Sequence, residues 1–243
     1  VTITINAGGF VEGIWTGVQN TDWFDCGNWQ SLTVPDETVD VVFGASATDD
    51  AVIDDASTEA AKYGGIARCN NLTLDTRTVF LEGDENDVLE VYGDLTINSG
   101  GVLDMDDGAK AIDGHLYLYG DWNNQAGEAD FMEGEGTIHL VGTGTQSIIT
   151  NSFTESFYNI TSDNSFLNGI SLNNDIIVTG ELTHSDGDIN LNGNNLEIQG
   201  AYDRTTGTFI GNIASDLVFS GSGAGGDIYF IDNYNLNLPL MYL

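Results

Sequence analysis

Short predicted strands separated by turns recur along this chain from Asn70 onward, and this repetition constrains the fold more than any other feature. Each strand alternates apolar and polar residues in a Leu-x-Leu pattern. The turns are rich in Gly, Asn and Asp, which accept a positive φ or close Asx turns. The seven steps between Leu72 and Leu217 average about 21 residues. The apolar positions are Leu72/Leu74, Leu95/Ile97, Leu116/Leu118, Ile138/Leu140, Ile160, Ile176/Val178, Leu196/Ile198 and Leu217/Phe219.

This period predicts an all-β chain folded as a parallel β-solenoid, which we expect to be a right-handed β-helix with coils of about 21 residues. One coil cannot bury its inward side chains alone, so coils must stack. An antiparallel sandwich also places turns every 8–12 residues or so. The similar phase of the Leu-x-Leu pairs, and the scarcity of two-residue hairpins, favour the solenoid.

A longer internal match divides the predicted solenoid into a first copy at about 93–179 and a truncated second copy at about 180–243. The copies open with GDLTINSGGVLDMDDG and GELTHSDGDINLNG. Eighty positions separate Leu116, Leu118, Gly120, Trp122 and Gly127 from Leu196, Ile198, Gly200, Tyr202 and Gly207. Because the second copy stops soon after Tyr234-Asn235-Leu236, we expect further repeats of a longer chain, or another protein, to cover the last coil.

Residues 1–68 do not follow the repeat, and we predict that they form an N-terminal capping module on a solenoid spanning 69–243. Three of the four tryptophans, Trp15, Trp23 and Trp29, lie in this module. A terminal coil exposes apolar side chains and unpaired backbone groups, so a solenoid needs a cap. We therefore predict that the tryptophans form the core of the cap. Stacking on sugar rings is the alternative role.

The charge is strongly acidic, with 38 acidic and 5 basic side chains and a net charge of −33. Such a surface repels nucleic acid and anionic membranes, and the sequence has no apolar run long enough for membrane insertion. An acidic exterior fits an extracellular location. In an oxidising compartment, Cys26 and Cys69 are predicted to form a disulfide, with two buried free thiols as the alternative.

The phrases WTGVQNTDWFDCGNW, VPDETVDVVF and CNNLTL resemble the N-terminal region of large secreted cell-surface, adhesin-like proteins of Bacteroidota. GTGTQSI and SFYNITSDN resemble later phrases of the same proteins, and the resemblance covers most of the chain. It implies a β-solenoid repeat protein exported by type IX secretion machinery to the cell surface, where surface glycans are candidate partners. No compact C-terminal sorting domain is visible, so the anchor and export route rest on the resemblance alone.

Three acidic turns could bind calcium, and no other cofactor is predicted. Turns that offer several carboxylate oxygens suit this ion, and solvated carboxylates are the alternative. Asp104 begins an EF-hand-like run, but His115 stands where the twelfth-position Glu would be. The candidate ligands are Asp84 and Asp87, Asp104, Asp106 and Asp107, and Asp186 and Asp188.

No catalytic residues are predicted. The three histidines recur at unrelated spacings, and a polysaccharide lyase would need a basic residue beside carboxylates. We therefore expect a non-enzymatic structural or adhesive segment, a stiff acidic rod at the cell surface. One alternative is a carbohydrate-active β-helix enzyme, either a lyase or a hydrolase with two carboxylates. The other is an extracellular filament subunit that assembles end to end through coil edges. The histidines are His115, His139 and His184, and the basic residues are Lys62, Arg68, Arg77, Lys110 and Arg204.

Overall fold

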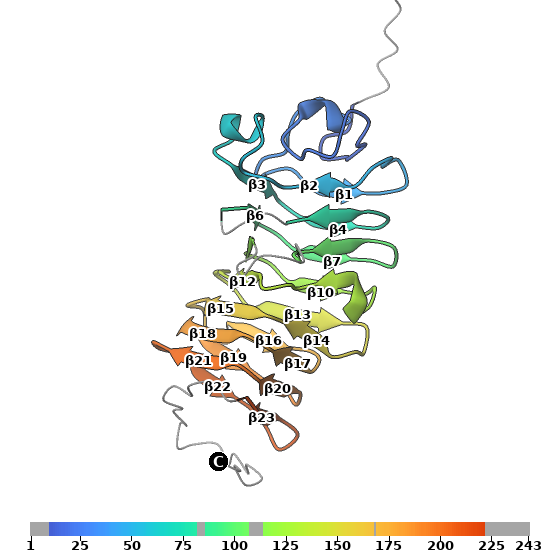
Figure 1. Ribbon diagram of the computed structural model, residues 1–243. Coiled ribbons are helices and arrows are strands. Elements are labelled where there is room, and N and C mark those ends of the chain that lie inside the picture. Colours follow the sequence, from blue (N-terminus) through green and yellow to red (C-terminus); the bar gives the residue numbers. More distant parts are fainter. Residues whose placement is uncertain (1–9, 82–85, 107–113, 168, 222–243) are drawn as a thin grey trace, which may run out of the picture.

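The computed structural model describes residues 10–81, 86–106, 114–167 and 169–221. Within these ranges the chain is all-β and winds into a parallel β-solenoid, as the sequence predicts, with coils of about 22 residues. Figure 1 shows the strands stacked as rungs from β1, beside the N-terminal segment, to β23 at the other end. The described residues also form three short 3₁₀ turns, η1 (Cys26–Asn28) before the first strand, η2 (Ala60–Lys62) and η3 (Glu128–Asp130).

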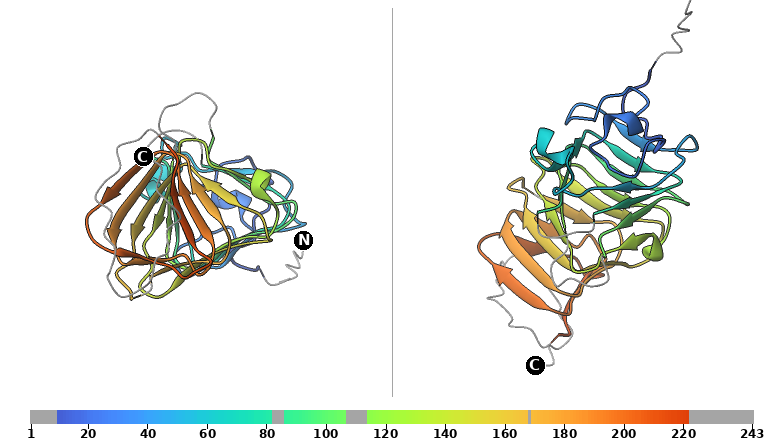
Figure 2. Two further views of the ribbon diagram at one scale, coloured as in Figure 1. Left: turned by 90° about the horizontal axis from the view of Figure 1, so that it is seen from below. Right: turned by 45° about the horizontal axis from the view of Figure 1, so that its top comes forward.

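Each coil passes through three strand positions in a fixed order, and Figure 2 shows the resulting faces around a common core. The first sheet contains β1 (Val41–Phe43), β4 (Leu72–Leu74), β7 (Leu95–Ile97), β10 (Trp122–Asn124), β13 (Gln146–Thr150), β16 (Ile170–Leu172), β19 (Asp188–Asn190) and β22 (Thr208–Ile210). The second sheet contains β3 (Ile66–Cys69), β6 (Val88–Val91), β9 (His115–Leu118), β12 (Thr137–Leu140), β15 (Asn159–Asp163), β18 (Glu181–Asp186) and β21 (Ala201–Arg204).

The remaining strand position is divided between two sheets of four strands. The third sheet, in the N-terminal half, contains β2 (Ala51–Val52), β5 (Thr78–Phe80), β8 (Val102–Asp104) and β11 (Phe131–Met132). The fourth sheet, in the C-terminal half, contains β14 (Glu155–Phe157), β17 (Ile176–Val178), β20 (Asn195–Ile198) and β23 (Asp216–Phe219). The break between β11 and β14 is therefore the one place where this strand position changes sheets among the described residues.

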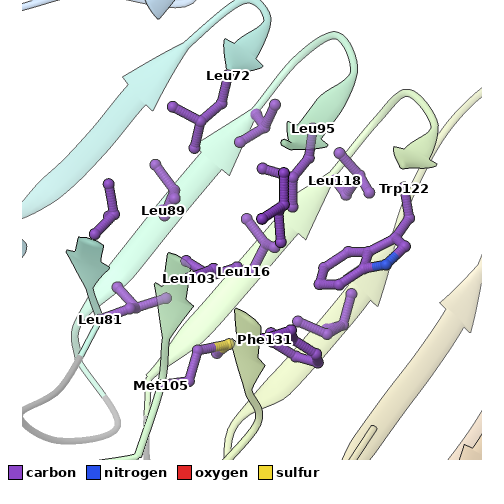
Figure 3. Close-up of a cluster of buried hydrophobic side chains, with 14 of the residues drawn as sticks. Leu72, Leu81, Leu89, Leu95, Leu103, Met105, Leu116, Leu118, Trp122 and Phe131 are labelled. Carbon is purple, nitrogen blue, oxygen red and sulfur yellow. The ribbon is translucent and has the colours of Figure 1, made fainter. Parts of the chain in front are cut away.

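Successive coils stack in register, which builds the core. In the second sheet Leu89, Leu116, Ile138 and Ile160 are aligned partners on neighbouring strands, and all are buried. Figure 3 shows the equivalent inward side chains of several coils meeting in the enclosed space. Burying a Leu or Ile side chain contributes about 1.5–3 kcal/mol, so the repeated inward position stabilises every coil against its neighbours.

The eighty-residue match does not relate equivalent positions in successive coils. Leu116 lies in β9 of the second sheet, whereas Leu196 lies in β20 of the fourth. Trp122 lies in the first sheet and Tyr202 in the second. Eighty residues correspond to three coils and about two-thirds of another at 22 residues per coil. The match therefore relates similar strand–glycine–strand units that occupy different faces.

The segment before β1 covers the first coil. Ile14 forms a parallel bridge with Val42, and Asp22 forms one with Val52. These bridges use backbone groups of β1 and β2 that would otherwise form an open edge. The predicted capping range of 1–68 also contains β1, β2 and most of β3, whose strands pair with β4, β5 and β6 in the solenoid sheets.

The three tryptophans before β1 lie inside this covering segment. Trp15, Trp23 and Trp29 are each at most 1% exposed. The Trp29 ring lies 5.0 Å from that of Trp15 and 4.9 Å from that of Trp23, edge to face in both pairs. Phe43 of β1 lies 5.3 Å from Trp15 and stacks on it. Their rings pack on one another and on the first coil, and none is open to a sugar.

The predicted disulfide is wrong, because Cys26 and Cys69 are both free thiols. Cys69 occupies an inward position of β3, aligned with Val91 of β6, and is fully buried. Cys26 is exposed in η1. The alternation of β3 directs the Cys69 side chain into the core. The alternative of two buried thiols is also wrong, since only one is buried.

Thiol labelling checks this assignment. We expect a maleimide to modify one cysteine, Cys26, in the native chain and both after unfolding in urea. Burial raises the pKa of the Cys69 thiol, which further suppresses its reaction. A Cys26→Ser variant should show no native labelling. Labelling that appears only after treatment with a reductant would contradict the free-thiol assignment.

Candidate functional site

Polar side chains at the corner between the second and first sheets join each coil to the next. Asn71 Oδ1 accepts the backbone N–H of Asp94 at 2.8 Å, and Asp94 Oδ1 accepts that of Asp121 at 2.8 Å. Asp121 Oδ1 in turn accepts the N–H of Ser147 at 2.7 Å. We call this series, which begins with Asp40 Oδ1 and the N–H of Asn71, the corner ladder. Many Asn and Asp side chains of the turns therefore bond the backbone of the neighbouring coil.

The glycine of the GDLTI and GDWNN phrases fits beneath the corner ladder. A Cβ atom on Gly93 would lie 2.2 Å from Asn71 Oδ1, and one on Gly120 would lie 2.4 Å from both Asp94 Oδ1 and the Gly93 carbonyl oxygen. Only glycine leaves room for this close approach of neighbouring coils.

Gln146 of the GTGTQSI phrase has a comparable role inside the solenoid. Its Nε2 donates to the carbonyl oxygens of Leu118 and Gly120, and its Oε1 accepts from the backbone of Gly142 and from Asn164 Nδ2. Gln146 and Asn164 are both buried. The phrase thus specifies a coil junction.

One group of carboxylates could hold a cation. One carboxylate oxygen from each of Asp54, Asp55 and Asp87 lies within 4.8 Å of the others. Asp87 is buried, and its Oδ1 accepts the N–H of Asp55 at 2.7 Å. Sequence reasoning selected Asp87 but missed Asp54 and Asp55, which stand one coil away. Calcium binding here stays a prediction.

Those of the other predicted calcium ligands that the structure describes, Asp104, Asp106, Asp186 and Asp188, do not join this group. Asp104 of β8 is aligned with Phe80 and Met132 on the outer face of the third sheet, and its Oδ1 accepts the N–H of Asp106. Asp186 Oδ1 accepts from the backbone of Gly187, and Asp188 bonds the Thr208 hydroxyl. Asp84 and Asp107 lie outside the described residues.

The described basic side chains all engage groups of their own chain. Arg68 pairs with Glu90 at 2.7 Å on the outer face of the second sheet. Arg77 donates to the Ala47 carbonyl and Arg204 to that of Gly207. Lys62 pairs with Glu59 in an exposed turn. Lys110 lies outside the described residues.

Two of the histidines meet, which sequence spacing did not reveal. His115 Nδ1 lies 3.0 Å from His139 Nε2, and the His139 ring stacks on Tyr117 at 4.1 Å. Burial, and secondly His115, lower the pKa of His139 to about 4. The two histidines are 24 residues apart, which is one coil of about 22 residues plus two residues. The coil length could therefore have indicated that they lie on adjacent strands. His184 lies apart, buried against Tyr202 and the Gly187 carbonyl.

A buried carboxyl group marks the break between the third and fourth sheets. Glu155, at the start of β14, is 0% exposed, and its Oε2 accepts from Trp122 Nε1 at 3.1 Å and Asn124 Nδ2 at 2.9 Å. Its Oε1 has no hydrogen-bond partner among the described residues. Burial raises the pKa of Glu155 to about 8, despite the two donated hydrogen bonds, and Glu128 and Glu133 raise it further.

Glu128 and Glu133 also line an open hollow of about 500 Å³ with Asp106 and Met132. Burial raises the pKa of Glu133 as well. Carboxyl groups with raised pKa values, as in Glu133 at the hollow and the buried Glu155, are a feature of many active sites. The sequence signal for the hollow, GEADFMEGEG at 127–136, reads only as an acidic turn.

Glu155 predicts a measurable pH dependence. Because its pKa in the folded chain lies above its ordinary value of 4.5, the stability that its neutral form contributes is complete below about pH 4.5 and is lost as the pH rises to about 8. Glu155→Gln keeps a neutral side chain that can accept both hydrogen bonds. We expect the free energy of unfolding of this variant, relative to the wild type, to rise by about 1.4 kcal/mol per pH unit within this window. Urea denaturation at pH 5 and pH 8 measures it.

Glu181→Gln is the matched control, because Glu181 is exposed on β18. Its pH dependence should follow that of the wild type. Parallel curves for Glu155→Gln and the wild type would contradict the buried, protonated carboxyl group.

Comparison of the chain with protein-family models, curated proteins and solved structures finds no match. Within the described residues, no helix has the length and apolar character needed to cross a membrane.

Proposed function

We propose that this chain is a non-catalytic, stiff and acidic rod within a secreted cell-surface protein, with a structural or adhesive role. The corner ladder is the observation that supports it, because polar side chains that could bind ligands instead tie each coil to the next. A net charge of −33 keeps such rods soluble and apart. Type IX export, further repeats beyond this chain and attachment to surface glycans belong to the same proposal.

Surface labelling and attachment test it. An antibody against the chain should label intact cells of the source organism, without permeabilisation. Deleting the coding sequence should reduce attachment of the cells while growth on polysaccharides is unchanged. Labelling that requires permeabilisation would contradict the surface location. Fibres formed by the purified chain in electron micrographs would instead favour an end-to-end filament.

A carbohydrate-active enzyme is the second candidate, favoured by Glu155 and the acidic hollow. Two carboxyl groups of different pKa are what glycoside hydrolysis needs. However, Glu155 is fully buried and bonded to Trp122, whose ring packs with those of Phe131 and Phe157 at centroid distances of 4.6–5.6 Å. Substrate therefore has no access to it in this structure. Release of reducing sugar from a polysaccharide panel by the wild type, but not by Glu155→Gln, would replace the rod proposal.

A further inference from the structure

The outer face of the second sheet brings two imidazoles together. His115 and Tyr117 are outward residues of β9, and His139 is an outward residue of β12. In the strand register Thr137 pairs with His115, and His139 pairs with Tyr117. The two histidines are thus diagonal neighbours on adjacent strands, and both are only half-buried.

The separation of the two ring nitrogens suits a shared metal ion. His115 Nδ1 and His139 Nε2 are 3.0 Å apart. Two metal–nitrogen bonds of about 2.0–2.1 Å place their nitrogens roughly 2.9 Å apart at a right angle and about 3.4 Å apart at a tetrahedral angle. The observed distance lies between these values. Both rings must turn away from their mutual hydrogen bond before their lone pairs meet at one ion.

The neighbouring Tyr117 ring fixes the position of His139 beside His115. The His139 ring is nearly parallel to Tyr117, with an interplanar angle of 5° and centroids 4.1 Å apart. This stack restricts the orientation of the ring while its Nε2 stays directed toward His115. Metal ligation uses the neutral form of an imidazole.

We propose that His115 and His139 form a two-imidazole site for a late divalent transition metal ion, copper(II) or zinc(II), with water in the remaining positions. Imidazole nitrogen suits both ions, and copper(II) binds most tightly in the divalent series. The acidic surface raises the local concentration of cations. In the metal-free chain the two rings share a hydrogen bond. On binding, the proton of that bond moves to the other nitrogen of its own ring, so no net proton is released.

Electron paramagnetic resonance with copper(II) tests the site, because nitrogen coupling separates imidazole from carboxylate ligation. The titration is run in excess magnesium, which occupies carboxylates. We expect coupling to two nitrogens in the wild-type chain, and an affinity lowered at least about tenfold in His115→Gln and in His139→Gln. His184→Gln, which removes the third histidine, should bind like the wild type. Circular dichroism confirms that each variant folds.

Nuclear magnetic resonance of the wild-type chain tests the site without any substitution, so the result does not depend on whether a variant folds. Zinc(II) should shift the ring ¹⁵N resonances of His115 and His139 and leave those of His184 unchanged. Copper(II) bound only through oxygen, nitrogen coupling that survives both substitutions, or zinc(II) shifts at neither His115 nor His139 would overturn the proposal.

Discussion

Replacing Gly120 with alanine should lower the free energy of unfolding by about 3 kcal/mol or more. The added Cβ would lie 2.4 Å from the Gly93 carbonyl oxygen and 2.5 Å from its carbonyl carbon. Both are backbone atoms of the preceding coil, so no side-chain rotation relieves the contact. The coils would have to separate locally, which also weakens the hydrogen bond from the Gly120 N–H to the same carbonyl oxygen. Urea denaturation of the two chains measures the loss.

Gly144→Ala is the matched control, because a Cβ at Gly144 meets nothing within 4 Å. We expect its stability to stay within about 0.5 kcal/mol of the wild type. If Gly120→Ala and Gly144→Ala have equal free energies of unfolding, the neighbouring coils are farther apart at Gly120 than in the structure.

Replacing Trp29 with alanine should cost about 3–5 kcal/mol, the range for deleting a large buried aromatic side chain. Trp29 is 1% exposed, packs edge to face on Trp15 and Trp23, and donates from its Nε1 to the Trp23 carbonyl at 2.8 Å. Its loss opens a cavity directly above Phe43 of the first coil. Thermal melting should show a lower transition temperature.

The control for Trp29→Ala is Val18→Ala in the same segment, since the Val18 side chain is 61% exposed. It should leave the melting temperature nearly unchanged. If Trp29→Ala melts like the wild type, the tryptophan cluster does not hold the covering segment on the first coil.

The fold could be predicted because burial imposes one pattern on every coil. Inward Leu and Ile at alternate positions, with Gly and Asx turns, can be read without knowing which face a strand belongs to. The sequence did not indicate to which sheet of the solenoid each strand belongs. The apolar pairs that recur in the sequence belong to different sheets, because Leu95 lies in the first sheet, Leu116 in the second and Leu196 in the fourth. Steps between faces are therefore uneven, and only strands within one sheet repeat at about 22 residues.

The candidate sites could be predicted less well, because they depend on the coil offset. Asp54 and Asp55 meet Asp87, and His115 meets His139, only when the chain is wound at the observed pitch. The disulfide prediction failed for a related reason. Cysteine count and compartment say nothing of the direction of a side chain, and β3 directs that of Cys69 inward.

Backbone hydrogen exchange at the corner ladder tests most directly whether polar side chains there serve coil stacking. The amide of Asp121 bonds Asp94 Oδ1, and the amide of Ser147 bonds Asp121 Oδ1. We predict that both exchange as slowly as strand amides of the core. Asp94→Ala should speed exchange at Asp121 and leave Ser147 protected, whereas Asp94→Asn should protect both. Fast exchange of these amides in the wild-type chain, like that of exposed loop amides, would contradict coil-to-coil bonding by corner side chains.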